Sequence, residues 1–171
     1  MTPRVVLIGP PGAGKTTVGQ ALAARLGVAF RDSDHDIEQA AGKPISEIFF
    51  DEGEGHFRAM EVSAISDALA EHDGVLALGG GAVIDASTRE LLHRHTVVYL
   101  EVGMADAAQR VGLARDRPVL ALNPRAMLHK LLAERDPLYR EVATATVKTD
   151  AKPVSAVVDE VAARIGESEA T

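Results

Sequence analysis

The sequence predicts an α/β protein of three layers, in which helices cover both faces of a five-stranded parallel sheet. Short runs rich in Val, Ile and Leu recur along the chain and are typical of strands buried on both faces. Segments with apolar residues at helical spacing separate these runs, and such alternation produces right-handed crossovers between parallel strands. The length of 171 residues suits one domain, so we expect residues 1–171 to fold as a single domain.

The expected strands are Val5–Ile8, Val28–Phe30, Val75–Leu78, Thr96–Glu101 and Ala143–Lys148. The expected helices are Lys15–Leu26, Ile37–Ala41, Ile45–Phe50, a longer one that includes Phe57 to Ala68, Ser87–His93, Ala105–Arg110, Pro124–Arg135 and Val154–Ile165. Gly27 should stop the first helix, and the helix Pro124–Arg135 is expected to end before Pro137. Residues 112–123 have no clear period and predict a loop, and residues 166–171 predict a frayed tail.

Composition and charge narrow the classes of partner. The net charge of −7 argues against a nucleic-acid or anionic-membrane partner, because either would require a basic face. The chain has no Cys, which excludes disulfides and thiolate chemistry and suits a reducing cytoplasm. No apolar run approaches the roughly 20 residues that span a bilayer, and we expect no signal peptide. We therefore predict a cytoplasmic protein.

A phosphate-binding motif follows the first expected strand. Gly9–Thr16 matches G-x-x-x-x-G-K-[ST] without a gap, between a buried-type strand and an amphipathic helix. Its glycines allow successive N–H groups to point at phosphate oxygens, and the helix that begins near Lys15 adds its dipole. Lys15 would reach the β- and γ-phosphates of a nucleotide, and Thr16 would offer its hydroxyl to Mg²⁺. The alternative is a chance Gly-rich turn with a surface lysine.

Polar residues follow the second expected strand. In open α/β sheets ligands bind beyond the C-terminal strand ends, so the segments after the first three strands should meet at one rim. Asp32 could hold Mg²⁺ through a water, and Asp34 could accept the proton of an attacking hydroxyl or orient it. The alternative is that this segment caps the N-terminus of a helix, which Asp and Ser both do well. The functional and the capping interpretations are compatible.

Three further features carry a functional and a structural interpretation. Arg58 could bind a carboxylate bidentately, although Arg58 and Glu61 at i,i+3 spacing are more typical of an exposed ion pair. Gly79-Gly80-Gly81 at a strand end could admit a ligand against the backbone, or form a simple turn. Arg117 could close over the phosphates, or be a solvated loop charge. The guanine-specifying N-K-x-D motif is absent, which excludes a regulatory GTPase.

Taken together, these motifs resemble the shikimate kinase family, of the nucleoside-monophosphate-kinase-like P-loop class with a mobile lid. The resemblance runs over nearly the whole chain and is weakest after Lys148. Its markers, in order, are Gly9–Thr16, Asp32-Ser33-Asp34, Phe57-Arg58-x-x-Glu61, Leu78-Gly79-Gly80-Gly81-Ala82, Arg117-Pro118-Val119-Leu120 and Arg135-x-Pro137-Leu138-Tyr139.

The resemblance implies a monomer that phosphorylates the 3-hydroxyl of shikimate with ATP and Mg²⁺. It implies an acceptor-binding region over residues 32–61 and a lid over residues 112–122. The shikimate pocket would be lined by Asp34, Arg58, Gly79, Gly80, Gly81 and Arg135, with Phe49 and Phe57 as apolar wall. The residues in contact with ATP would be Gly12, Ala13, Gly14, Lys15, Thr16, Thr17, Arg110 and Arg117. The catalytic residues would be Lys15, Asp34 and Arg117. The metal ion would be bound by Thr16 and Asp32.

One departure from the family pattern concerns the adenine. The family often has a basic residue in the loop after the fifth strand, and residues 149–153 offer an Asp and a single Lys there. Two rival functions also stay open on the residues alone. One is another small-molecule kinase, such as a gluconate or nucleoside-monophosphate kinase, and the other is a non-catalytic ATP-binding module.

Overall fold

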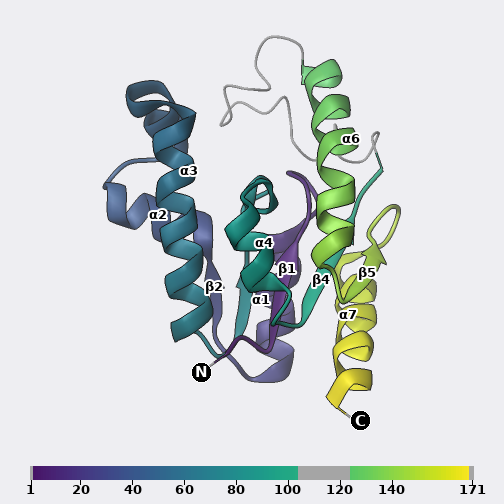
Figure 1. Cartoon of the computed structure of the whole chain (residues 1–171). Helices are drawn as coiled ribbons and strands as arrows, with labels where there is room; N and C mark the ends of the chain where they lie inside the picture. Colours follow the sequence, from purple (N-terminus) through teal and green to yellow (C-terminus); the bar gives the residue numbers. More distant parts are fainter. Residues whose placement is uncertain (1, 104–123, 170–171) are drawn as a thin grey trace.

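A computed structural model describes residues 2–103 and 124–169 of the chain (Figure 1). Five strands form one sheet in the order β2-β3-β1-β4-β5, and every neighbouring pair is parallel. Their bounds are β1 Val5–Ile8, β2 Phe30–Asp32, β3 Val75–Ala77, β4 Val97–Glu101 and β5 Ala145–Lys148. The predicted α/β architecture with a five-stranded parallel sheet is confirmed. The order changes direction at β1, so the phosphate loop leaves the central strand of the sheet.

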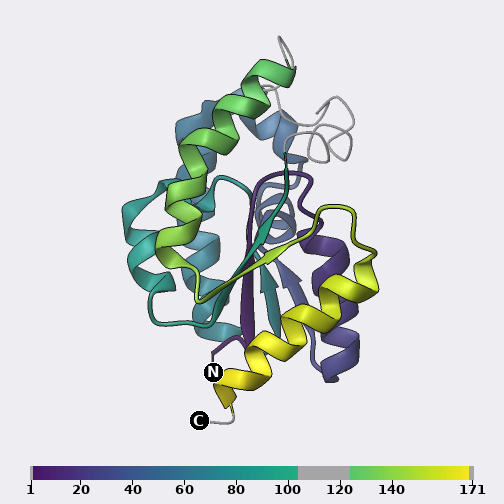
Figure 2. The same ribbon diagram turned by 90° about the vertical axis from the view of Figure 1, so that its right-hand side faces the viewer.

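Helices lie on both faces of this sheet, as Figure 2 shows with α7 on one side and α6 on the other. Their bounds are α1 Lys15–Leu26, α2 Ser33–Ala41, α3 Ile45–Glu71, the short 3₁₀ helix η1 Ala82–Ile84, α4 Ala86–Leu92, α6 Pro124–Val142 and α7 Val154–Glu169. Side chains of α1 and α7 pack on one face together with Leu128 of α6, and side chains of α3, α4 and the C-terminal part of α6 pack on the other. None of the helices in the described ranges is both long enough and apolar enough to cross a membrane.

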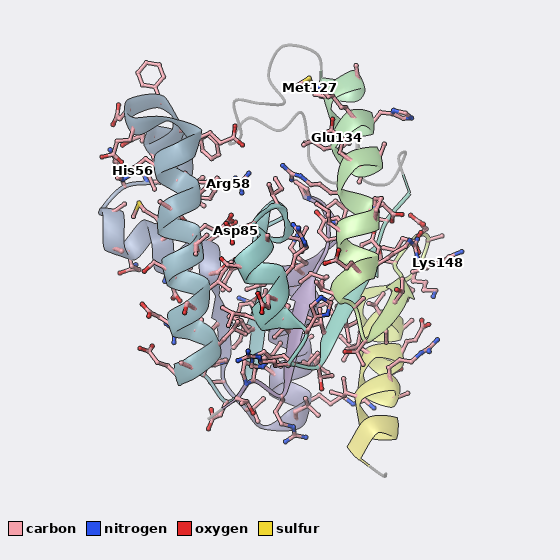
Figure 3. The ribbon with its side chains drawn as sticks, viewed as in Figure 1. His56, Arg58, Asp85, Met127, Glu134 and Lys148 are labelled. Carbon is pink, nitrogen blue, oxygen red and sulfur yellow. The ribbon has the colours of Figure 1, made fainter. Side chains whose placement is uncertain are left out.

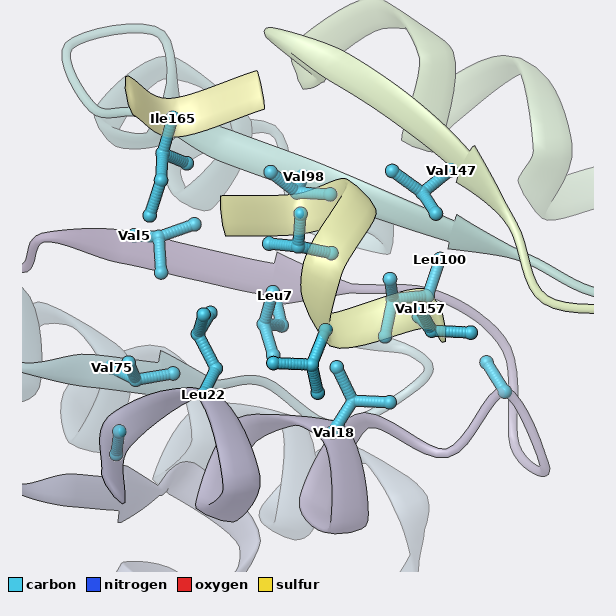
Figure 4. Packing of buried hydrophobic residues seen from close by; sticks show 14 of the residues in the cluster. Val5, Leu7, Val18, Leu22, Val75, Val98, Leu100, Val147, Val157 and Ile165 are labelled. Atoms are coloured by element: carbon cyan, nitrogen blue, oxygen red, sulfur yellow. The ribbon is translucent and has the colours of Figure 1, made fainter. Parts of the chain in front are cut away.

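The core on the α1 and α7 face shows how the strand pattern builds the layers (Figure 4). Val5 and Leu7 of β1 point to this face, and Val6 and Ile8 point to the opposite one, because successive side chains of a strand alternate. All four are buried, which explains the uninterrupted apolar run of β1. Fully burying one such side chain contributes about 1.5–3 kcal/mol.

A smaller apolar cluster holds α2 and α3 together, away from the sheet. Ile37, Ile45, Ile48 and Phe57 are its buried members. The Phe57 ring also packs on Phe49, with ring centroids 4.8 Å apart. This cluster fixes the part of α3 from which Arg58 projects.

The second strand lies two residues later than the sequence suggests. The expected strand Val28–Phe30 is wrong at its start, because the Val28 backbone is hydrogen-bonded to the last turn of α1. Gly27 adopts a left-handed conformation with φ 68°, and the Val28 N–H donates to the Ala23 carbonyl at 3.0 Å. This bond satisfies a carbonyl of the last helical turn. The strand consequently begins at Phe30 and extends to Asp32, at the rim of the sheet.

Several helix boundaries also differ from those expected. Helix α2 begins at Ser33, four residues before the expected Ile37, because the Asp32 side chain caps it there. The two helices expected after residue 44 are joined within α3 across a kink at Gly53, whose φ of 85° and ψ of 168° are not helical. Helix α6 does not end before Pro137 but continues to Val142. Proline cannot donate to the carbonyl four residues earlier, and burial of Tyr139 and Val142 in the core beyond it offsets that loss. Helix α7 extends past Ile165 into the expected tail.

Candidate active site

A cleft of about 380 Å³ lies where β1, β2 and β3 end. The segments that follow these three strands meet there, as expected for the C-terminal rim of a parallel sheet. The lining residues are Pro11, Gly12, Gly14, Lys15, Thr16, Thr17, Asp32, Asp34, Leu78, Gly79 and Gly80. The cleft thus joins most of the residues expected at the nucleotide with part of those expected at the acceptor.

The phosphate loop, Gly9–Thr16, wraps around the ammonium group of Lys15. Lys15 Nζ donates to the carbonyl of Gly9 at 2.7 Å and to that of Pro10 at 3.0 Å. Gly12 and Gly14 have φ of 84° and 85°, a left-handed conformation that glycine adopts without strain. Helix α1 begins at Lys15 directly after Gly14, which has no side chain to cap it. The first N–H groups of α1 therefore face the cleft as donors for an anion.

A hydroxyl and a carboxylate meet beside this loop. Thr16 Oγ1 donates to Asp32 Oδ2 at 3.0 Å. The other oxygen of Asp32 accepts from the Asp34 N–H at 2.9 Å and caps α2, so the helix-cap interpretation of Asp32 is correct. No group of three or more His, Asp or Glu that could hold a metal occurs in the described part of the chain. One carboxylate and one hydroxyl suit Mg²⁺, which keeps several waters and is bound chiefly through substrate phosphates.

Asp34 lies against the first glycine after β3. A Cβ atom added at Gly79 would come within 2.5 Å of Asp34 Oδ1 and 3.1 Å of Glu61 Oε2. The Gly79 N–H donates to the buried Ser33 Oγ at 3.3 Å, which ties the start of α2 to the end of β3. Glycine at position 79 therefore allows the Asp34 carboxylate to stand at the floor of the cleft.

Arg58 approaches the same segment from α3, and Figure 3 shows its side chain directed toward the α6 side of the molecule. Its guanidinium group occupies the space that a side chain at Gly81 would need. Arg58 Nη1 donates to Glu61 Oε1 at 2.8 Å, and the guanidinium carbon lies 5.2 Å from the centroid of the Phe57 ring. Glu61 is only 3% exposed, so this pair is not the exposed helix-surface pair considered from the sequence.

The ion pair between partly exposed Arg58 and buried Glu61 leaves donor capacity on the arginine. Arg58 Nε is buried and has no hydrogen-bond partner within the described ranges. A buried donor of this kind is costly unless a ligand or water satisfies it. The expected carboxylate ligand would supply that acceptor.

Arg135 lies apart from these groups, on α6. It is 7% exposed, which is unusual for arginine and indicates a surrounding that pairs its charge. Neither Arg135 nor Arg58 nor Gly81 lines the cleft itself. Arg110, Arg117 and the expected lid at residues 112–122 lie outside the described residues.

A second hollow, of about 220 Å³, adjoins the phosphate loop. Its lining residues are Ala13, Gly14, Thr17, Val18, Thr149, Lys152, Val154 and Val157. Gly14 and Thr17 line both hollows, so the phosphate loop separates them. The N–H of Ala13 donates within the loop, to Pro10 at 3.2 Å, and its methyl group is buried.

Sequence reasoning missed three contributors to this geometry. Pro11 lines the cleft and packs against Gly80, where an added Cβ would lie 2.8 Å from Pro11 Cδ. Ser33 and Tyr139 bind the backbone of the glycine segment, at Gly79 and Gly80. Ser33 and Tyr139 stand within recognised motifs, but nothing in the local pattern says which backbone group their hydroxyls reach.

Comparison with known proteins shows the family of this chain. The family model described as "Shikimate kinase" matches residues 11–166. The chain belongs to the shikimate kinase family. It is 61% identical to a shikimate kinase of Salinispora arenicola over 95% of this chain and 98% of that one. It is 57% identical to a shikimate kinase of Saccharopolyspora erythraea over 96% of this chain and 95% of that one.

Solved structures of shikimate kinases share the fold. Shikimate kinase from Acinetobacter baumannii in complex with shikimate superposes with a TM-score of 0.94 at 40% identity, covering 100% of this chain and 96% of that one. A gluconokinase from Sinorhizobium meliloti 1021 gives a TM-score of 0.63 at 22% identity, covering 95% of this chain and 91% of that one. The latter likeness concerns the fold alone, so the family assignment rests on the shikimate kinases.

Proposed function

We propose that this chain transfers the γ-phosphate of ATP to the 3-hydroxyl of shikimate, giving shikimate 3-phosphate and ADP in aromatic amino-acid (chorismate) biosynthesis. The observation that carries the proposal is that the Lys15 loop and Asp34 line the same cleft. Membership of the shikimate kinase family supports the acceptor, as does a solved relative that holds shikimate.

In this proposal Asp34 serves the acceptor hydroxyl. A bond forms between the 3-oxygen of shikimate and the γ-phosphorus, the bond from that phosphorus to the bridging oxygen of ADP breaks, and the hydroxyl proton is released. Asp34 aligns the hydroxyl for in-line attack, as a base or as a hydrogen-bond acceptor alone. Its place against Gly79, beside the phosphate loop, supports this role.

The nucleotide is held by the loop that Lys15 organises. Backbone N–H groups of Gly12, Gly14, Thr16 and Thr17, with the α1 dipole, bind the phosphates beside Ala13, and Lys15 balances charge on the transferring group. To do so, the Lys15 ammonium exchanges its contacts with the Gly9 and Pro10 carbonyls for phosphate oxygens. The hollow beside Thr149 and Lys152 would take the base, with Arg110 against the adenine.

Thr16 and Asp32 would hold Mg²⁺. Thr16 Oγ1 and Asp32 Oδ2 already lie 3.0 Å apart at the edge of the cleft. Two protein oxygens suit Mg²⁺, because this ion keeps several of its waters when it binds. When bound, the ion neutralises charge on the β- and γ-phosphates.

Recognition of the acceptor carboxylate is assigned to Arg58 and Arg135, over a floor of Gly79, Gly80 and Gly81. The buried Nε of Arg58 supports this assignment, because a planar carboxylate could accept from it. Phe57, under the guanidinium group, keeps that plane fixed and provides apolar wall with Phe49.

The remaining parts of the proposal follow from family membership. Residues 1–171 act as one kinase domain, with residues 32–61 binding the acceptor. The lid over residues 112–122 brings Arg117 to the γ-phosphate. Closure of the lid also excludes water, which would otherwise hydrolyse ATP. Arg117→Ala should lower turnover more than ATP binding. We further propose a cytoplasmic monomer without nucleic-acid or membrane partners; sedimentation analysis at assay concentration checks the monomer.

The direct test measures acceptor-dependent ADP release with Mg²⁺ and ATP, using shikimate, gluconate, AMP and CMP in parallel. Release with shikimate alone, and a product heavier than shikimate by one phosphoryl group, is expected. Release with gluconate would transfer the assignment to that acceptor. ATP binding without release for any acceptor would show a non-catalytic module.

A further inference from the structure

Tyr139 is a motif residue that the proposed chemistry does not use. It lies in α6, four residues after Arg135, and its side chain is 1% exposed. Its hydroxyl donates to the carbonyl oxygen of Gly80, the middle residue of the glycine floor. A phenol at this depth has to find an acceptor, and the acceptor that it has found belongs to the wall of the cleft.

Gly80 is held from two sides. Pro11 of the phosphate loop packs against its Cα, and Tyr139 holds its carbonyl from α6. Gly79 and Gly81 on either side are fitted against Asp34 and Arg58. The position of Gly80 therefore sets how the floor sits between the phosphate loop and the two acceptor side chains.

Helix α6 also carries Arg135. Residues four apart lie on the same face of a helix, so Arg135 is one turn from the point at which Tyr139 holds the floor. Both side chains are buried. A tie between Tyr139 and Gly80 thus fixes the height of the floor relative to Arg135.

We propose that Tyr139 is a positioning residue for the acceptor: its hydroxyl holds the Gly79–Gly81 floor in register with Arg135 and the phosphate loop. The inference rests on the proposed function, since the floor is the place assigned to shikimate. Tyr139 does not touch the reacting atoms. It acts through the Gly80 backbone, and removing its hydroxyl should loosen the acceptor more than the nucleotide.

Tyr99 provides a matched control. Its ring stacks on that of Tyr139 with centroids 4.8 Å apart, and it is 2% exposed. Its hydroxyl donates to Asp136 Oδ1 at 2.7 Å, so it ties β4 to α6 without reaching the floor. Burial and this hydrogen bond raise the pKa of the Tyr99 hydroxyl, which stays protonated at neutral pH.

The test compares Tyr139→Phe with Tyr99→Phe in steady-state kinetics and thermal unfolding. Each variant loses one hydroxyl and keeps its ring, so similar losses of Tm are expected. Tyr139→Phe should raise KM for shikimate about tenfold, the order of one lost hydrogen bond, with KM for ATP within about twofold of the parent. Tyr99→Phe should leave both KM values within about twofold. Equal KM values for shikimate in the two variants would overturn the inference.

Failure of the proposed function is distinguishable from failure of this inference. A parent protein that phosphorylates no shikimate would remove both, whereas an active parent with an unaffected Tyr139→Phe variant removes only the role of Tyr139. A second measurement serves if Tyr139→Phe does not fold. The chain has 2 tyrosines, so 3-fluorotyrosine labelling gives two ¹⁹F resonances, which Tyr99→Phe assigns. Shikimate should shift the Tyr139 resonance more than that of Tyr99; equal shifts would contradict the inference.

Discussion

The proposed nucleotide side and the proposed acceptor side of the active site are built in different ways. The nucleotide side is one continuous segment, Gly9–Thr16, whose working groups are backbone N–H donors and one lysine. The proposed acceptor side is assembled from α2, α3, the end of β3 and α6. Asp34, Gly79 and Gly80 line the cleft, whereas Arg58 and Arg135 lie beyond its lining. Local backbone conformation fixes the nucleotide side, and packing between distant elements fixes the acceptor side.

The difference has a consequence for substitutions. A change in the phosphate loop should affect every reaction of the nucleotide, whatever the acceptor. A change on the acceptor side should affect the binding or turnover of one substrate. The size of this effect should depend on how many neighbouring residues hold the altered group.

Lys15→Met should have the largest effect. The variant loses the ammonium group that the loop encloses, and with it the charge that balances the transferring phosphoryl group. We expect kcat to fall about 10³-fold or more, with weaker ATP binding. Lys130→Met, on the exposed surface of α6, is the matched control and should leave both values unchanged. If Lys15→Met retained a tenth of the parent kcat, the proposed role of this loop in phosphoryl transfer would be wrong.

Asp34→Asn should separate the two sides. Its amide can no longer take a proton or hold the hydroxyl as a carboxylate does, so kcat should fall about 10²- to 10³-fold. ATP affinity, measured by titration calorimetry, should stay within about twofold. Asp36→Asn, two residues later in α2, removes an ion pair with Arg31 away from the cleft and should keep full turnover. An equal loss of ATP affinity in Asp34→Asn would show that the two sides are not independent.

This contrast also explains what the sequence could predict. The phosphate loop is a contiguous motif, so its residues and its place at the end of β1 were predictable. The convergence of Asp32, Asp34 and the glycine segment followed from the rim rule for parallel sheets. Strand β2 was misplaced because the bond from Val28 to Ala23 extends the end of α1, and no residue pattern records that bond.

The acceptor side was less predictable for a physical reason. Three consecutive glycines suggested a ligand against the backbone, but the spaces beside them are filled by Asp34, Pro11 and Arg58 of the chain itself. Such contacts depend on the angle between α3 and the sheet, and on α6 continuing through Pro137 to place Tyr139. Both are properties of packing, which spacing along the sequence does not specify.

Gly81→Ala should test whether the Arg58 guanidinium needs the space that glycine leaves at position 81. The new methyl group would overlap the Arg58 guanidinium, which must then move. We expect KM for shikimate to rise about tenfold, as one charge-assisted contact is displaced, with unchanged KM for ATP. Gly55→Ala, in α3 with open space around its Cα, is the control. It should leave kinetics unchanged and stabilise the helix by about 0.5–1 kcal/mol. Parent-like kinetics in Gly81→Ala would show that Arg58 does not depend on this glycine.

Asp85→Ala should have the smallest effect, on stability alone, because Asp85 caps α4 beyond the floor without lining the cleft. Hydrogen bonds from the Ser87 hydroxyl and the Thr88 N–H lower the pKa of Asp85 below 3.8. The carboxylate therefore contributes stability above that pH, and the contribution is lost as pH falls through the folded pKa. We expect Asp85→Ala to cost about 1 kcal/mol near neutral pH, roughly 2–4 °C in Tm, and less in acid. Asp85→Asn keeps a neutral cap, so its Tm should approach that of the parent as the pH falls. A cost of Asp85→Ala that does not diminish in acid would mean that the charge of Asp85 contributes nothing to the cap.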